Sequence, residues 1–255
     1  MRAVFIDIKP VERRLPSESK HAGCCSSCNV RELCLPGGLD AEDLTRIDNM
    51  VYARRRLERG EVLYYAGAES AAMYAIRSGS FKTSLFDAER PEQVVGFFMG
   101  GEILGLEGLG REKYNATAVA LEDSEVCVLS EGLVERLTRA IPALQRRLHS
   151  LLAREILREQ KMMMLLGRMR AEQRLATFLI NLSVGSVGRG YSSSDFHLRM
   201  TREEMGSYLG LKLETVSRLF RQFHDAVLIE VDYKHVRILD LPGLQRLLDD
   251  HAATV

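Results

Sequence analysis

The segment from Thr201 to Phe223, TREEMGSYLGLKLETVSRLFRQF, constrains the fold more than any other part of the chain. Thr201 and Glu204 have the spacing of a capping box, which starts a helix, and Gly210 suits a tight turn. A second helix is expected to begin near Lys212. This spacing predicts a helix-turn-helix, and the alternating segment 227–239 that follows predicts a two-stranded wing with its turn at 232–234.

The second helix of this motif is expected to have an apolar face and a polar face. The core-facing positions are Leu213, Val216, Phe220 and Phe223, and the outward-facing positions are Glu214, Ser217, Arg218 and Arg221. Arginine can bind a guanine edge through two hydrogen bonds, and glutamate can accept one from cytosine. The outward set therefore predicts a helix that reads double-stranded DNA. The alternative is a helical hairpin with a solvated polar face.

The charge balance does not favour DNA binding. The chain contains 35 basic and 35 acidic residues, and residues 171–255 contain 10 Lys and Arg against 11 Asp and Glu. Since a nucleic-acid-binding domain commonly carries a net positive charge, we count this balance mildly against DNA. Recognition must then depend on local side chains.

Two other patterns precede the helix-turn-helix. Short alternating runs broken by glycines extend from about residue 55 to 130 and predict an antiparallel barrel or roll. A long helix is expected from about Leu144 to Met169, followed by shorter helices and a polar loop at 183–194. One face of the long helix has the spacing of a helix–helix seam, which fits either intrachain packing or a dimer interface. The seam positions are Leu148, Leu152, Ile156, Glu159, Met163 and Leu166.

The cysteines are concentrated near the N-terminus. Four of the five lie between positions 24 and 34, and Cys25, Cys28 and Cys34 have the spacing C-x2-C-x5-C. No apolar run approaches the roughly 18 to 20 residues of a membrane-spanning helix, and no secretory signal is evident, so we expect a cytoplasmic protein without a membrane partner. Because the cytoplasm keeps thiols reduced, clustered cysteines there indicate metal ligands or redox groups.

The run Gly210-Leu211 followed by Glu214-Thr215-Val216-Ser217-Arg218 resembles the recognition helix of the fumarate-and-nitrate-reductase regulator branch of the CRP/FNR superfamily. The resemblance covers nearly the whole chain, from cysteine arm to wing. It implies an α+β fold with a cyclic-nucleotide-binding-like antiparallel β-roll, a long dimerisation helix and a C-terminal winged helix-turn-helix. The expected parts are a cluster-binding arm (1–37), the sensor roll (38–140), the dimerisation helix (141–170) and the DNA-binding domain (171–255).

The same resemblance implies a function. It predicts an oxygen-responsive transcription regulator that acts as a homodimer on TTGAT-type palindromes and contacts RNA polymerase. Glu214, Ser217 and Arg218 would lie at the base edges. Two half-sites related by a palindrome match the two-fold axis of a dimer.

The resemblance also implies one 4Fe-4S cluster per subunit on Cys25, Cys28, Cys34 and Cys127, since such a cluster takes four cysteine ligands. By spacing alone, zinc fits as well, and an isolated Cys127 among apolar neighbours is more often a core residue. A ligand set with Cys24 in place of Cys25 stays open. The principal alternative is a regulator switched by thiol or zinc chemistry, in which Cys25 and Cys28 form a disulfide or bind zinc.

Two further functions are not expected. Gly101-Glu102 resembles the pair that contacts ribose in cyclic-AMP-binding relatives, but Tyr114-Asn115 stands where those relatives have an Arg-Ser pair for the phosphate. Arg111 and Lys113 lie nearby, so a cyclic nucleotide remains a minor alternative. An enzyme is not expected because the six histidines are scattered and no catalytic motif is present.

Glu159 is the one acidic residue of the seam. In a parallel dimer it would face its own copy, and two carboxylates brought together repel each other. We expect this repulsion to make the dimer sensitive to small changes in the cysteine arm. The alternative is that Glu159 turns to solvent or pairs with Arg158 or Lys161.

Overall fold

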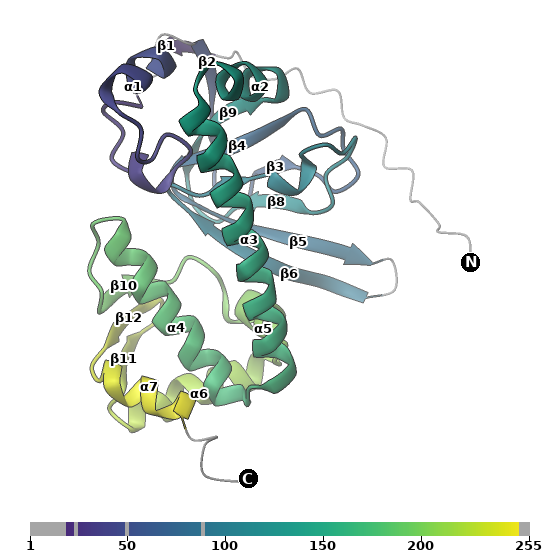
Figure 1. The fold of residues 1–255 in the computed structure, drawn as a ribbon. Coiled ribbons are helices and arrows are strands. Elements are labelled where there is room, and N and C mark those ends of the chain that lie inside the picture. The colour runs from purple at the N-terminus through teal and green to yellow at the C-terminus, as the bar shows by residue number, and fades with distance from the viewer. Residues whose placement is uncertain (1–18, 23–24, 49–50, 88–89, 250–255) are drawn as a thin grey trace.

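The computed structural model describes residues 19–22, 25–48, 51–87 and 90–249. Its N-terminal half is built on two antiparallel sheets (Figure 1), with strand orders β1-β2-β9-β4-β7 and β3-β8-β5-β6. The strands are β1 (Ser19–Ala22), β2 (Val51–Leu57), β3 (Val62–Tyr64), β4 (Ala72–Ser78), β5 (Ser80–Asp87), β6 (Arg90–Met99), β7 (Ile103–Leu104), β8 (Thr117–Ala120) and β9 (Ser124–Ser130). Phe81, Ile76 and Val126 are almost fully buried within this half. The predicted antiparallel roll is confirmed.

Short helices flank the sheets: η1 (Arg31–Leu33), α1 (Ala41–Asp48), η2 (Leu106–Gly108) and α2 (Glu131–Ala140). Asp40 caps α1, because its carboxylate accepts a hydrogen bond of 2.8 Å from the Asp43 amide. The cysteine-rich segment, η1 and α1 form one side of the N-terminal half.

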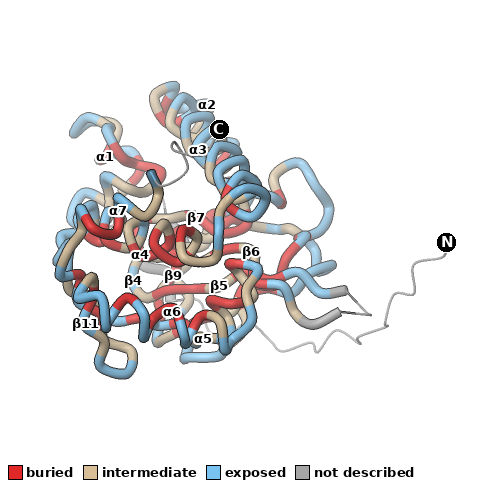
Figure 2. The backbone as a smooth tube through the Cα atoms, turned by 90° about the horizontal axis from the view of Figure 1, so that it is seen from below, coloured by how far each residue is buried: buried red, intermediate tan, exposed pale blue. Residues whose placement is uncertain are grey.

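Helix α3 (Pro142–Arg168) extends from the roll to the C-terminal half. It begins two residues before the predicted Leu144, because Pro142 fits the first helical turn, where no amide partner is required. Only Leu144 and Leu165 are buried along its 27 residues, and Figure 2 shows the rest of it as largely exposed. Its length therefore exceeds what packing within this chain requires.

The C-terminal half consists of α4 (Ala171–Gly188), β10 (Asp195–His197), α5 (Arg202–Leu209), α6 (Leu213–Asp225), β11 (Ile229–Asp232), β12 (His235–Ile238) and α7 (Leu241–Asp249). Helices α5 and α6 form the predicted helix-turn-helix. Gly210 ends α5 in the left-handed conformation, with φ of 63°. Strands β11 and β12 form the predicted wing, and β10 adds a third strand to it.

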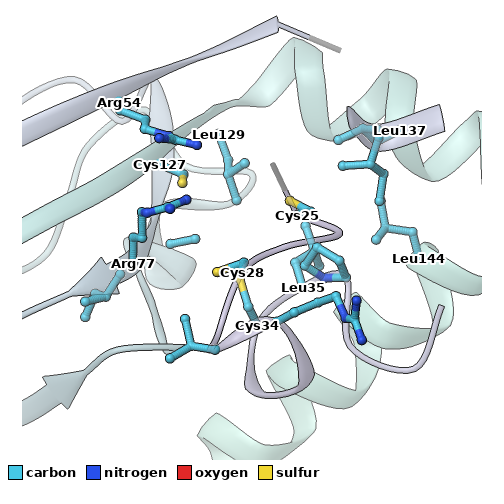
Figure 3. A pocket seen from close by; sticks show the side chains of 16 residues that line it. Cys25, Cys28, Cys34, Leu35, Arg54, Arg77, Cys127, Leu129, Leu137 and Leu144 are labelled. Atoms are coloured by element: carbon cyan, nitrogen blue, oxygen red, sulfur yellow. The ribbon is translucent and has the colours of Figure 1, made fainter. Parts of the chain in front are cut away.

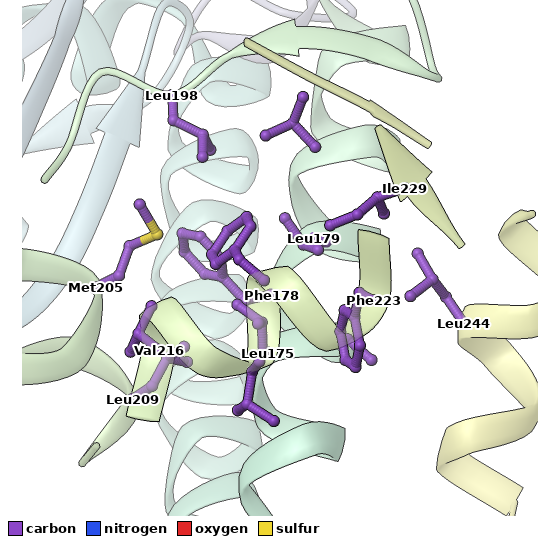
Figure 4. Packing of buried hydrophobic residues seen from close by; sticks show 14 of the residues in the cluster. Leu175, Phe178, Leu179, Leu198, Met205, Leu209, Val216, Phe223, Ile229 and Leu244 are labelled. Atoms are coloured by element: carbon purple, nitrogen blue, oxygen red, sulfur yellow. The ribbon is translucent and has the colours of Figure 1, made fainter. Parts of the chain in front are cut away.

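Two details of this half were predicted wrongly. The polar stretch expected as a loop from 183 to 194 is helical as far as Gly188, because Ser183 and Ser186 are buried and their hydroxyls donate to the carbonyls of Ser193 and Leu182. Leu213 does not join the core. It is the first residue of α6 and is 44% exposed. Leu219 is 2% exposed and belongs to the same buried cluster as Phe223, which Figure 4 labels.

The capping box that starts α5 gives a stability prediction. The Glu204 amide donates to Thr201 Oγ1 at 3.1 Å, and the Thr201 amide donates to Glu204 Oε2 at 2.7 Å. Thr201→Ala should reduce the free energy of unfolding by about 1 kcal/mol, because one helical amide loses its acceptor. Urea unfolding measures this, with Thr201→Ser as the matched control. Equal destabilisation by both changes would contradict the capping role.

Polar contacts join the helix-turn-helix to the roll. Lys82 Nζ on β5 lies 3.0 Å from Glu204 Oε1 on α5. Ser207 Oγ donates to the Glu92 carbonyl at 3.0 Å and accepts from the Val94 amide at 2.8 Å. The two halves therefore meet where β5 and β6 contact α5.

Candidate functional site

Cys25, Cys28, Cys34 and Cys127 line one cavity (Figure 3). The first three come from the segment around η1, and Cys127 lies on β9. The cavity holds about 630 Å³ of empty space, part of it open to solvent. Most of the remaining lining is apolar and includes Leu35, Ile47, Ala75, Leu129, Leu137 and Leu144. The fold thus brings together thiols that lie about ninety residues apart in the sequence.

Hydrogen bonds hold the cysteine segment in a series of turns. The Cys28 amide donates to the Cys25 carbonyl at 3.2 Å, and the Cys34 amide donates to the Val30 carbonyl at 3.2 Å. Asp48, at the end of α1, accepts from the amides of Cys25 at 2.6 Å and Ser26 at 3.2 Å. These bonds fix the first turn against α1.

Arg147 of α3 holds the other end of this segment. Its Nη2 donates to the Glu32 carbonyl at 2.8 Å, and its Nε donates to the Cys34 carbonyl at 3.2 Å. A side chain at Gly37 would collide with both partners, since a Cβ there would lie 2.5 Å from the Glu32 oxygen and 2.7 Å from Arg147 Nη2. The turn after Cys34 is therefore built around the guanidinium of the long helix.

Burial makes two of the four thiols poor acids. Burial raises the pKa of Cys34 to about 12, and the neighbouring cysteines act in the same direction. Burial also raises the pKa of Cys127 to about 11, although the charges of Arg54 and Arg77 oppose that shift. Both thiols are therefore protonated at neutral pH, and a metal or cluster that binds them must displace their protons.

The described cysteines do not group around a single metal ion. None of the four described cysteines forms a disulfide. Within the described ranges, no three His, Cys, Asp or Glu side chains lie close enough to hold one metal ion. An iron–sulfur cluster is wider than a single ion and takes ligands that stand farther apart. Cys24, the alternative ligand, lies outside the described residues.

The predicted DNA-reading residues lie together on α6. Glu214, Ser217, Arg218 and Arg221 are all exposed. The opposite face of the helix is buried through Val216, Leu219, Phe220 and Phe223. This packing fixes the orientation of the helix, so that the four polar side chains form one accessible face.

The predicted seam on α3 is half-buried at Leu148 and Leu152 and exposed further along. Ile156 is 60% exposed and Met163 is 66% exposed, with Leu166 less so. Glu159 lies among them, with Oε1 3.9 Å from Arg158 Nη2. Several exposed apolar side chains on one helix are typical of an interaction site.

The expected nucleotide-binding positions have other contacts. Glu102 accepts a hydrogen bond of 2.6 Å from the Met99 amide and pairs with Arg189 at 3.0 Å. The Tyr114 ring is buried and stacks on Tyr64 with centroids 4.0 Å apart. Tyr114 therefore makes an aromatic core contact at the position where binding of a nucleotide phosphate would require a positively charged side chain.

Sequence reasoning did not single out Asp48, Arg54, Arg77 or Arg147. None belongs to a sequence motif, and each reaches the cysteine segment or its cavity only through the way the chain folds.

Among the described residues, no helix is long and apolar enough to span a bilayer.

Comparisons with known proteins identify the family. A profile described as "Crp-like helix-turn-helix domain" matches residues 173–247, and one described as "Cyclic nucleotide-binding domain" matches residues 54–140. The transcriptional regulatory protein btr of Bordetella pertussis is 46% identical, and the match covers 93% of this chain and 98% of btr. The fumarate and nitrate reduction regulatory protein of Escherichia coli is 34% identical over 92% of this chain and 96% of its own length.

A solved structure agrees with these relatives. FixK2 from Bradyrhizobium japonicum superposes with a TM-score of 0.72 at 25% identity, covering 81% of this chain and all of FixK2. The similar proteins regulate transcription and are not enzymes. Full-length similarity and the observed order of roll, long helix and helix-turn-helix show that this chain belongs to the CRP/FNR family of DNA-binding transcription regulators.

Proposed function

We propose that this regulator responds to oxygen through one 4Fe-4S cluster per subunit, held by Cys25, Cys28, Cys34 and Cys127. The observation that carries the proposal is the meeting of these four thiols in one cavity with a largely apolar lining. When bound, the cluster would supply sensitivity to oxygen. The protein would act in the cytoplasm and control genes of anaerobic or microaerobic growth.

Residues of α3 would connect the cysteine cavity to the DNA-binding helices. Arg147 bonds the carbonyls beside Cys34 and stands next to Leu148, the first seam position of α3. The exposed apolar residues of α3 would pair two subunits and present two α6 helices to a TTGAT-type palindrome. RNA polymerase would be a further partner. In this proposal the chain has four parts with separate tasks. They are the cluster-binding arm (1–37), the sensor roll (38–140), the dimerisation helix (141–170) and the DNA-binding domain (171–255).

A titration of anaerobically purified protein on a TTGAT palindrome, with and without air, tests this function. We expect brown protein that binds tightly without air and loses both colour and affinity in air. Colourless protein that binds equally well in both conditions would overturn the proposal.

The alternatives have less support. A thiol switch that used Cys34 or Cys127 would need accessible thiolates, whereas burial raises the pKa of both thiols. A disulfide between Cys25 and Cys28 would leave those two cavity thiols without a role. Zinc has less support because no three His, Cys, Asp or Glu side chains among the described residues lie close enough to hold one ion. A cyclic nucleotide would have to displace the contacts of Glu102 with Met99 and Arg189.

The exposed face of α6 gives a prediction about DNA reading. Arg218→Ala should weaken binding to a matched site by about 1 to 3 kcal/mol and relax discrimination at one base pair, because a bidentate contact to guanine is lost. Glu214→Ala should behave likewise at the opposing cytosine. Binding titrations on matched and single-substituted sites measure this. Equal weakening on every sequence would instead mark these residues as phosphate contacts.

A further inference from the structure

The charged side chains that line the cysteine cavity all have the same sign. Arg31, Arg54 and Arg77 contribute to the lining, and no carboxylate does so among the described residues. Arg31 is engaged elsewhere, because its Nε lies 2.9 Å from Glu32 Oε1 and its Nη1 donates to the Ser26 carbonyl. Arg54 and Arg77 lie on either side of Cys127 in Figure 3.

The strand register explains this placement. Arg54 on β2 pairs directly with Cys127 on β9, so that their side chains leave the same face of the sheet close together. On the other side of β9, Ala75 of β4 pairs with Cys127, and its small side chain leaves room. Arg77 follows two residues later, at a register shift between Ile76 and Ser78, and irregularities of this kind redirect side chains.

We propose that Arg54 and Arg77 are the counter-charges of the cysteine site and set the reduction potential of the group bound there. This inference rests on the proposed cluster. A 4Fe-4S core with two positive charges on four thiolates is a dianion, and one-electron reduction adds a third negative charge. In a largely apolar cavity, two nearby guanidinium groups interact strongly with such charges and favour the more negative state.

Glu125 limits the effect of Arg77. Its Oε2 lies 3.1 Å from Arg77 Nε, and its side chain is mostly buried. A carboxylate there partly cancels the charge of Arg77. Neutralising Glu125 should therefore act in the opposite direction to neutralising either arginine.

Mediated redox titration of anaerobically purified full-length variants, starting from dithionite-reduced protein, tests the proposal. Arg54→Gln and Arg77→Gln should each lower the potential by about 59 mV or more, which is a tenfold change in the one-electron equilibrium. Glu125→Gln should raise it. Arg54→Lys keeps the charge and should resemble the parent. Arg59→Gln should have no effect, because Arg59 is exposed in the turn after β2.

The outcomes separate this inference from the proposed function. A parent protein without iron and sulfide would contradict the cluster itself. A parent with a cluster, but with the same potential in Arg54→Gln as in Arg59→Gln, would overturn only the counter-charge role. Arg54→Gln could fail to assemble a cluster, and the iron content of Arg54→Lys then tests the counter-charge role. Normal iron loading in Arg54→Lys would support that role. Iron loading as low as in Arg54→Gln would overturn it.

Discussion

Cys34→Ala and Cys127→Ala should each abolish the brown colour of anaerobically purified protein and reduce iron and sulfide to background. A 4Fe-4S cluster needs four ligands, and the cavity offers no described carboxylate or histidine to replace a lost thiolate. DNA binding without air should fall to the level of the air-treated parent. Iron and acid-labile sulfide per chain, measured beside the visible spectrum, test this expectation.

The control is Cys24→Ala, which should retain the full cluster. Cys25 lies in the cavity, and its amide is held by Asp48. A loss of iron in Cys24→Ala as large as in Cys25→Ala would show that the neighbouring cysteine is the ligand. Full cluster in Cys34→Ala or Cys127→Ala would contradict the ligand set.

The sequence predicted the helix-turn-helix well because local chemistry determines it. The capping box at Thr201, the left-handed Gly210 and the turn of the wing each depend on residues that are only a few positions apart in the chain. The long helix was also predictable, since no proline interrupts it after its first turn. Three of the predicted seam residues, Ile156, Met163 and Leu166, are exposed, and so are Leu157 and Met164 beside them. The seam and the dimer stay predictions.

The cysteine cavity could be anticipated only through resemblance. Nothing local distinguishes Cys127 from a core cysteine, and its position beside the other thiols depends on the pairing of β9 with β2 and β4. The place of Arg54 beside Cys127 could not be predicted from the sequence either, because it follows from strand register. The helical extension to Gly188 escaped prediction for a similar reason, since long-range burial of Ser183 overrides its preference for a loop.

Glu159→Ala should give a protein that remains dimeric in air and binds DNA without a cluster. Arg158 offers Glu159 little compensation, because its Nη2 lies 2.6 Å from Glu155 but 3.9 Å from Glu159. The Arg158 guanidinium also stacks over the Phe98 ring, 4.2 Å from its centroid. Glu159 therefore has only a distant ion-pair partner in Arg158, and it shares its helix face with Ile156 and Met163.

Two such carboxylates at a dimer axis would repel each other by about 1 to 4 kcal/mol, depending on how far water screens them. Each 1.4 kcal/mol changes a dissociation constant about tenfold, so losing this repulsion should strengthen the dimer by about fivefold to several hundredfold. The apolar residues of α3 would then suffice without help from the cysteine arm. Glu159→Gln should match Glu159→Ala, and Glu159→Asp should match the parent, if charge is the cause. Sedimentation in air decides: variants as monomeric as the cluster-free parent would refute the repulsion while leaving the DNA-reading role of α6 intact.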